Sequence, residues 1–166
     1  MFLFAGCGGK DSREITDPRE RVSFEIPTGW ETLPNSNGTR FRAPVQEGAT
    51  HPSQAIIMVN TSLEDEPRDL VRQRDAWIAN HERRGLRIVV SSKYEAKGVA
   101  GVEFANEQTG MMGQEILHQI HFQYPGVLVL THLQVSVEDY ETMLPVYREV
   151  VDSIHPLSVE SGSEGH

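Results

Sequence analysis

The sequence has 166 residues, of which 38% are hydrophobic and 23% are charged, and its formal net charge is −9. This length and composition suit one folded domain, and no apolar run approaches the ~20 residues of a membrane-spanning helix. The acidic balance argues against a nucleic-acid-binding protein, which needs a basic face. The single cysteine excludes an internal disulfide and any metal site built from several cysteines.

The N-terminal segment contains the clearest functional motif of the chain. Leu3-Phe4-Ala5-Gly6-Cys7 is similar to a bacterial lipobox, in which small residues admit a signal peptidase and the cysteine thiol then receives the lipid. Phe4 stands where the lipobox has its leucine, and a complete basic and apolar signal region is missing, so we expect the true start to lie upstream of Met1. We therefore predict that Cys7 is lipidated, with palmitate as a marker, and that residues 1–7 are the remnant of a lipoprotein signal peptide.

Glycine and polar residues after the cysteine predict a flexible tether over residues 8–20. Two alternatives remain for Cys7, which could be an incidental thiol on a frayed N-terminus or a reactive catalytic residue. Catalysis would need a helix N-terminus or a fixed cationic neighbour to lower the pKa of the thiol, and a glycine tether provides neither.

The first half of the folded part has the pattern of β-strands. Alternating apolar and polar residues predict a strand over Val22–Ile26. Asn35-Ser36-Asn37-Gly38 separates two short extended runs, which predicts a hairpin. A loop is expected over residues 44–54, and four consecutive apolar residues within Ala55–Leu63 predict a strand that is covered on both faces.

A helix is expected next, because Pro67 follows three acidic residues and Gly85 stands just beyond an expected end near Arg84. Its apolar stripe is thin and consists of Leu70, Val71, Trp77 and Ile78. We therefore expect one edge of this helix to pack on the domain while the rest faces solvent.

Four extended runs with short breaks then predict consecutive antiparallel hairpins, over Arg87–Ala96, Val99–Gln108, Gln114–Tyr124 and Val127–Ser136. Helical spacing of apolar residues over 138–154 predicts a closing helix, and either this helix kinks at Pro145 or its main part starts there. The order predicts an α+β fold, an antiparallel sheet of about six to seven strands with a C-terminal four-strand meander, flanked by helices on both faces.

The histidines of the meander are candidates for acid–base or metal chemistry. His118 and His121 are three residues apart, so on a strand they point to opposite faces. A tight hairpin at Pro125-Gly126 brings His121 diagonally close to His132 on one face, but no carboxylate or third histidine is readily placed beside them. We expect half-buried sheet histidines with no metal and no cofactor, and the alternative is a metal enzyme that uses His121, His132 and a nearby acid.

Three other residues are candidates for a ligand or partner surface. Trp30 could line a pocket, although packing over the first hairpin is the more ordinary role of a large aromatic residue. Met111 and Met112 lie at an expected hairpin tip, where they could offer soft copper ligands or an apolar contact, or form an ordinary loop. The sequence contains no Gly-x-Ser-x-Gly elbow, no zinc-protease motif and no dinucleotide fingerprint, so we predict that the protein is not an enzyme.

Most of the negative charge lies at the C-terminal end. Residues 136–166 contain seven acidic residues and one basic residue, Arg148, which gives this segment a net charge of −6. A solvated helix face followed by a disordered polar tail over 158–166 is the simplest explanation. The alternative is an acidic docking face on a soluble, unlipidated adaptor.

Two short motifs carry a family resemblance. Phe24-Glu-Ile-Pro-Thr-Gly-Trp30 resembles the Phe-x-(Ile/Val)-Pro-x-Gly-Trp opening of PsbP-like and DcrB-like domains, and Val146–Ile154 resembles their final helix. The resemblance implies an antiparallel sheet between helices, and it supplies no common catalytic residues. Family members include photosystem II extrinsic proteins, a Ran-binding nuclear factor and many bacterial lipoproteins of unknown role.

Together these features predict a single PsbP-like α+β domain over residues 21–157, preceded by the signal remnant and tether and followed by the tail. The expected function is that of a non-catalytic binding or assembly module, lipid-anchored in the bacterial cell envelope and facing the periplasm or the exterior. Its expected partners are the membrane, reached through the lipid on Cys7, and an envelope protein or small ligand of unknown identity. No nucleic acid partner is expected.

Overall fold

The computed structural model describes residues 11–35, 38–45, 55–96, 98–110 and 113–157. Cys7 with the lipobox, Met111, Met112 and the predicted tail lie outside the described residues. Within them the elements are, in chain order, β1 (Ser12–Thr16), β2 (Val22–Pro27), β3 (Glu31–Leu33), β4 (Thr39–Arg42), β5 (Ile56–Leu63), α1 (Leu70–Arg83), β6 (Arg87–Ala96), β7 (Val99–Gly110), β8 (Gly113–Tyr124), β9 (Val127–Ser136), α2 (Tyr140–Ser153) and β10 (His155–Pro156).

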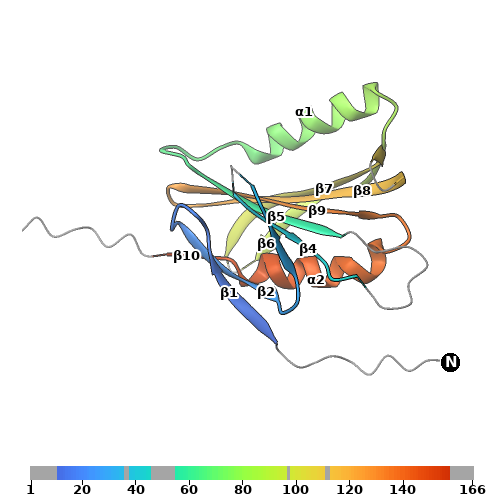
Figure 1. Ribbon diagram of the computed structural model, residues 1–166. Helices are drawn as coiled ribbons and strands as arrows, with labels where there is room; N and C mark the ends of the chain where they lie inside the picture. Colours follow the sequence, from blue (N-terminus) through green and yellow to red (C-terminus); the bar gives the residue numbers. More distant parts are fainter. Residues whose placement is uncertain (1–10, 36–37, 46–54, 97, 111–112, 158–166) are drawn as a thin grey trace, which may run out of the picture.

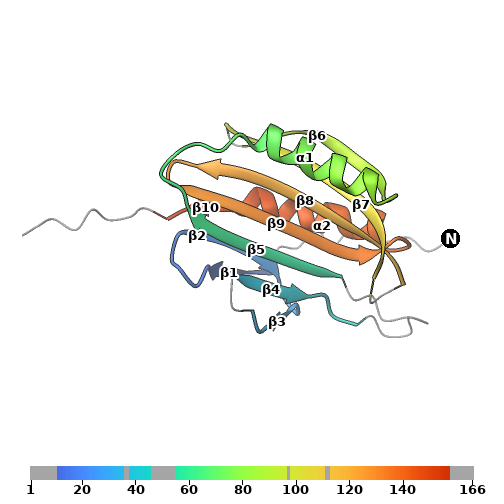
Figure 2. The ribbon, with the colours of Figure 1, turned by 90° about the horizontal axis from the view of Figure 1, so that it is seen from above.

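Seven strands form one antiparallel sheet in the order β3-β4-β5-β9-β8-β7-β6. The strands β6 to β9 follow one another in chain and in space, so the predicted four-strand meander is confirmed (Figure 2). The meander joins the earlier strands through the pairing of β5 with β9, which places β5 in the interior of the sheet. The predicted α+β architecture is therefore confirmed.

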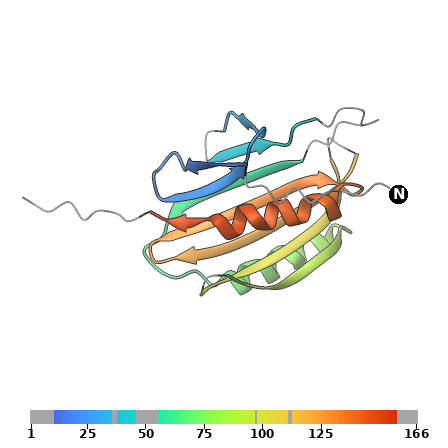
Figure 3. The same ribbon diagram turned by 90° about the horizontal axis from the view of Figure 1, so that it is seen from below.

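The two helices lie on opposite faces of the large sheet (Figure 1). α1 packs over β6 and β7, whereas α2 lies on the other face, against β9 and β2. A second antiparallel sheet, in the order β1-β2-β10, lies beside α2 on this same face (Figure 3). The domain thus has three layers, with the middle one formed by the large sheet.

The N-terminal boundary of the domain differs from the prediction. Residues 12–16, which fall within the predicted flexible tether, form β1 and pair with β2 from Ser12↔Pro27 to Thr16↔Ser23. Only Ile15 of this strand is partly buried, and it packs against the main core. Because β1 has only one inward apolar residue, its composition is that of a polar linker. The alternation of apolar and polar residues therefore does not reveal this strand.

A buried aspartate holds the turn between β1 and β2. The Asp17 side chain is buried, and its Oδ1 atom accepts the backbone N–H groups of Arg21 and Val22 at 2.5 and 2.9 Å. The hydroxyl of Thr61, on β5 of the large sheet, donates to the other oxygen at 2.8 Å. One carboxylate therefore closes the turn and joins the small sheet to the large one.

The main core fills the space between the large sheet and the layer made of α2 and the small sheet. Phe24 on β2 meets Phe41 on β4 edge to face, with ring centres 5.9 Å apart. A smaller core lies beneath α1 and consists of Leu70, Val102, Phe104 and Leu128, with Trp77 and Leu130 packed against it. The thin apolar stripe predicted for α1 is confirmed except at Val71, which is 41% exposed.

Both helices begin at positions that differ from the simplest expectation. α1 starts at Leu70 rather than at Pro67, because the side chain of Asp69 accepts the backbone N–H of Arg72 at 2.9 Å and caps the helix. α2 is one continuous helix from Tyr140 to Ser153 with Pro145 inside it. The alternative in which the main helix starts at Pro145 is therefore wrong.

Gly101→Ala tests the close packing of β7 on β8. A Cβ at this position would lie 2.3 Å from the carbonyl oxygen of His121 and 2.8 Å from the Cβ of Phe122, so the two strands would have to move apart. We expect a loss of about 1–3 kcal/mol in the free energy of unfolding, measured by urea denaturation. Ala100→Ser changes the exposed neighbouring residue and should alter the unfolding midpoint little. Equal midpoints for the two variants would contradict this close approach of the strands.

Candidate functional site

Of the residues predicted as a ligand or partner surface, His121 and His132 lie together, whereas Trp30 lies apart from them in the main core. Trp30 is 7% exposed and belongs to the main core, so its role is packing. His121 and His132 lie on the α1 side of the large sheet, with ring centres 5.8 Å apart. His121 pairs with Leu130 and His132 with Gln119, so the diagonal arrangement predicted from the Pro125-Gly126 hairpin is confirmed.

A row of aromatic and histidine rings in contact with one another extends from α1 to this histidine pair. His81 stacks on Trp77 with ring centres 3.6 Å apart, and Trp77 contacts Phe104 at 4.6 Å. Phe104 meets the ring of His121 edge-on at 5.0 Å, and His121 neighbours His132. The row fixes the helix on the sheet, and it excludes water from one side of the histidine pair.

Burial lowers the pKa of both histidines, to about 3 for His121 and about 4 for His132, and the nearby His132 also contributes to the shift at His121. Both imidazoles are therefore neutral near neutral pH. The pair thus consists of two neutral rings, and the buried Nε2 atom of His121 has no hydrogen-bond partner among the described residues.

On the opposite face, a buried polar network lies between the sheet and α2. The fully buried His118 contacts the Tyr140 hydroxyl through Nδ1 at 2.7 Å and Glu103 through Nε2 at 2.8 Å. Arg148 also bonds the Glu103 carboxylate, which accepts the Ser92 hydroxyl at 3.2 Å as well. Because a carboxylate only accepts, Nε2 of His118 donates to Glu103.

The charge state of this network follows from its contacts. Burial by itself raises the pKa of Glu103, but the hydrogen bond and charge of His118, with Arg148 and Ser92, outweigh it, so the pKa of Glu103 lies below its ordinary value. Burial raises the pKa of Tyr140 to about 12, and the Glu103 charge adds to the increase. Glu103 is therefore ionised and Tyr140 protonated near neutral pH.

Sequence reasoning did not identify this network, and it placed no carboxylate beside the histidines. Glu103 and His118 meet because Ala105 pairs with His118, which puts Glu103 diagonally beside it on the same face. The available signal was a glutamate at an inward position in the apolar run Val102–Ala105. Using it requires the register of the β7–β8 hairpin, which the alternation of residues alone does not determine.

A pair of buried hydroxyl groups lies further along α2 and is separate from this network. The Tyr147 hydroxyl receives the backbone N–H of Ile120 at 3.1 Å and contacts the Thr131 hydroxyl at 2.7 Å. The Thr131 hydroxyl donates to the carbonyl of Ile120 at 2.9 Å, so Tyr147 donates to Thr131. These bonds fix the helix on the interior strands β8 and β9.

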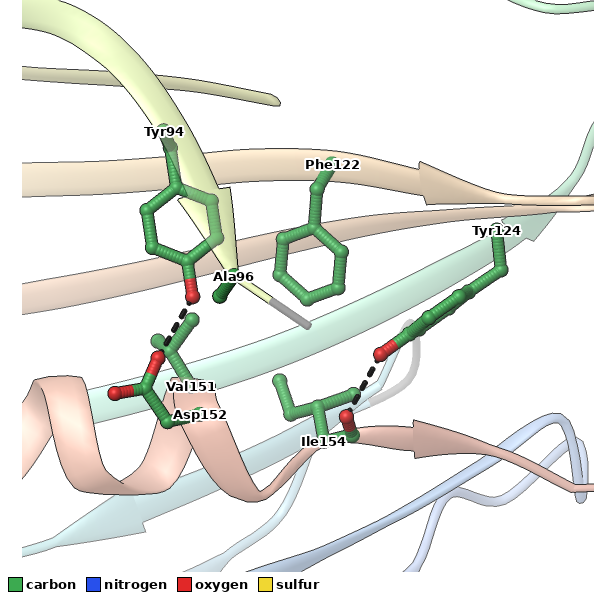
Figure 4. Close-up of a pocket in the computed structure, with 7 residues that line it drawn as sticks. All are labelled: Tyr94, Ala96, Phe122, Tyr124, Val151, Asp152 and Ile154. Carbon is green, nitrogen blue, oxygen red and sulfur yellow. Dashed lines mark hydrogen bonds between the residues drawn. The ribbon is translucent and has the colours of Figure 1, made fainter. Parts of the chain in front are cut away.

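A notch lies where α2 meets the edge strand β6 (Figure 4), and an open groove lies beside it. In the notch the Tyr94 hydroxyl donates to Asp152 and the Tyr124 hydroxyl donates to the carbonyl of Ile154, each at 2.8 Å (Figure 4). Burial raises the pKa of both tyrosines, and the Asp152 carboxylate raises that of Tyr94 further. The groove has a volume of about 500 Å³ and is lined by both acidic and basic side chains, namely Lys93, Glu95, Glu103, Arg148 and Asp152.

A second open hollow, a cleft of about 610 Å³, lies at the N-terminal end of α1. Its acidic rim comes from the segment before α1, Glu64 to Glu66, and its apolar surface includes Leu70, Val99 and Tyr124. Arg68 forms an ion pair with Glu64 at 2.5 Å. Among the described residues, the acidic side chains of the rim without an ion pair are therefore Asp65 and Glu66. Both hollows are wide enough to contact a peptide or small molecule.

The described residues provide neither a metal cluster nor a membrane-spanning helix. No group of three or more His, Cys, Asp or Glu side chains comes close enough to hold one metal ion there. No helix in the same part of the chain is long and apolar enough to cross a bilayer.

Comparison with solved structures identifies the fold as PsbP-like. The chain matches cyanobacterial PsbP (CyanoP) from Synechocystis with a TM-score of 0.62 and 12% identity, covering 95% of this chain and 99% of that one. The Ran-binding protein Mog1p of Saccharomyces cerevisiae matches with a TM-score of 0.57 and 9% identity, over 87% of this chain and 94% of that one. LpqN of Mycobacterium tuberculosis, described as involved in cell envelope biogenesis, matches with a TM-score of 0.53 and 11% identity, over 91% and 88% respectively.

No family model matches the sequence, and no curated protein matches it. At these identities the structural likeness establishes the shared fold. The resemblance that the Phe24–Trp30 motif and the final helix predicted is confirmed at that level.

Proposed function

We propose that this chain is a non-catalytic binding or assembly module that a lipid on Cys7 anchors in the bacterial cell envelope, facing the periplasm or the exterior. The observation that carries the non-catalytic part is the closed network beneath α2. His118, Glu103 and Tyr140 have the chemistry of an acid–base relay, but each is nearly or fully buried and is bonded to another member. Groups that satisfy one another inside a core stabilise it, and only the Glu103 end of this network borders the open groove.

Two surfaces support the binding role. The groove beside β6 and the acidic-rimmed cleft before α1 are both open, and both are bordered by charged side chains that neighbouring molecules can reach. Known structures with this fold include one described as Ran-binding and one described as involved in cell envelope biogenesis. For this chain we propose the general role of binding at the envelope, with no named partner.

The anchor is proposed from the lipobox-like segment Leu3–Cys7, which directly precedes the folded domain. A thioether-linked diacylglycerol would by itself give the two acyl chains that stable anchoring needs, and an acyl chain on the new N-terminus would add a third. The domain itself then needs no membrane-spanning element.

Cys7→Ser in the native host tests the anchor. The gene is expressed with its upstream region, and we expect labelled palmitate in the parent protein, accumulation of a larger precursor under globomycin, and recovery with membranes. The Cys7→Ser variant should incorporate no label and remain unprocessed, whereas Ser12→Ala, a nearby exposed position, should behave as the parent does. A parent protein that is unlabelled and soluble would refute the anchor.

A soluble, unlipidated adaptor is the second candidate, and one contact favours it. Arg148, the single basic residue of segment 136–166, is engaged with Glu103, which leaves the exposed positions Glu141, Glu149 and Asp152 of α2 acidic. Such a face suits a basic partner. The same fractionation separates the candidates, since an adaptor is soluble, unprocessed and indifferent to Cys7→Ser.

A further inference from the structure

The α1 face of the large sheet is only partly covered. α1 lies over β6 and β7, and no helix of the described residues lies over β5 and β9 (Figure 2). The histidine pair lies at the border between the covered and the uncovered part, with His121 on β8 next to the packed rings and His132 on β9. His121 is therefore buried against the packed rings, whereas His132 lies next to the part of the sheet that no described helix covers.

A methionine completes this cluster. Met58 on β5 is the direct cross-strand neighbour of His132, and both point to the same face of the sheet. Directly opposed residues of antiparallel strands have Cβ atoms about 5 Å apart, which brings a thioether within reach of the imidazole. Three neighbouring strands thus contribute Met58, His132 and His121 to one patch.

Two polar atoms of the patch lack partners. The Nε2 atom of His121 and the Oδ1 atom of Asn60, two residues along β5 from Met58, are buried without a hydrogen bond among the described residues. Proteins rarely leave buried polar atoms unpaired, and such atoms point to an ion or water that supplies the missing contact. The unpaired imidazole nitrogen is the stronger indication, because it is a metal ligand.

We propose that His121, His132 and Met58 form a binding site for a single Cu⁺ ion. Two imidazoles and a thioether are soft or borderline ligands, and Cu⁺ accepts such a set with two or three donors. Structural zinc requires about four ligands, and calcium requires about six to eight oxygen ligands, whereas this patch supplies two imidazoles, one thioether and one amide oxygen. Imidazoles on one metal, each with its nitrogen about 2.0 Å from the ion, have ring centres roughly 5 to 6 Å apart, and the observed separation is 5.8 Å. The site lies within the folded domain, so it stands or falls independently of the lipid anchor.

Competition with bathocuproine disulfonate under anaerobic, reducing conditions tests this proposal. The chain is used in a Cys7→Ser background, because a free thiol binds Cu⁺ strongly by itself. We expect the protein to withdraw one equivalent of Cu⁺ from the chelator. His121→Gln and His132→Gln should each weaken binding by at least about tenfold, and Met58→Leu should weaken it less.

Matched controls use the same residue types elsewhere in the chain. His155→Gln, on the exposed strand β10, and Met143→Leu, on α2, should leave the affinity unchanged. Circular dichroism melts check that each variant folds, and Ag⁺ titration of the Cys7→Ser protein with both histidines intact, followed by NMR of the histidine rings, should shift the signals of His121 and His132 alone. This measurement decides the question if a histidine variant fails to fold.

Three results would overturn the proposal. The protein could take no Cu⁺ from the chelator, or it could bind Cu⁺ with equal affinity after both histidine substitutions. Binding that survives those substitutions but disappears in a Met111→Leu/Met112→Leu variant would place the copper at the β7–β8 hairpin tip instead.

Discussion

Glu103→Ala should lower the free energy of unfolding by about 3–5 kcal/mol, the largest effect expected for any single charged residue of the domain. The Glu103 side chain is 7% exposed and is bonded to His118, Arg148 and Ser92. Its removal leaves the Nε2–H of the fully buried His118 without an acceptor and opens a small cavity beneath α2. Urea denaturation followed by tryptophan fluorescence measures the change.

Glu107 provides the matched control, because it lies on the same face of β7 but forms an exposed ion pair with Arg87. Glu107→Ala should cost less than about 1 kcal/mol. The double variant Glu103→Leu/His118→Phe should be more stable than Glu103→Ala, since it replaces the whole polar pair with apolar groups. Similar unfolding midpoints for Glu103→Ala and Glu107→Ala would show that the network beneath α2 contributes little to stability.

The histidine pair should make the protein less stable as the pH falls from about 6.5 to about 4.5. In the unfolded chain these imidazoles take up protons near their ordinary pKa of 6.5, whereas in the folded protein the pKa is lowered to about 3 for His121 and about 4 for His132. The unfolded state therefore binds more protons in this window, and the free energy of unfolding decreases as the pH falls. At about 1.4 kcal/mol per pH unit and per histidine, the loss is on the order of 2 kcal/mol for each by pH 4.5.

Chemical denaturation at a series of pH values, in metal-free buffer, measures this slope. His121→Leu and His132→Leu should each reduce it between pH 6.5 and 4.5, whereas His155→Gln, at an exposed position, should not change it. Glu103 acts at lower pH, because its pKa is lowered and its contribution is lost only as the pH falls below the ordinary glutamate value of 4.5. A slope that persists in both histidine variants would mean that the rings are solvated in the folded protein.

The meander and α1 could be predicted because their signals are local. Glycine or proline stands in the short breaks of the meander, and the apolar stripe of α1 has helical spacing. β1 and the small sheet could not be predicted in this way. β1 contains one apolar residue, and β10 pairs with β2 through His155↔Ser23, two residues that are more than a hundred positions apart. Pairing over such a distance depends on the packing of the whole chain.

The same distinction applies to the candidate sites. A tight turn at Pro125-Gly126 brings His121 and His132 together, so sequence reasoning could place them. The relay beneath α2 takes Glu103 and His118 from one hairpin but Tyr140 and Arg148 from a helix that crosses it. The docking position of α2 is set by the burial of Tyr147 and Val150 against the sheet, and no local pattern specifies it.

The start of β1 sets how far the domain can stand from a lipid on Cys7. Ser12, the first residue of β1, follows Cys7 by five positions, and an extended chain of this length spans at most about 18 Å. That distance is less than half the thickness of a bilayer, which is about 40 Å. A lipidated protein would therefore hold its small sheet close to the lipid headgroups and meet only partners that are themselves at the membrane surface.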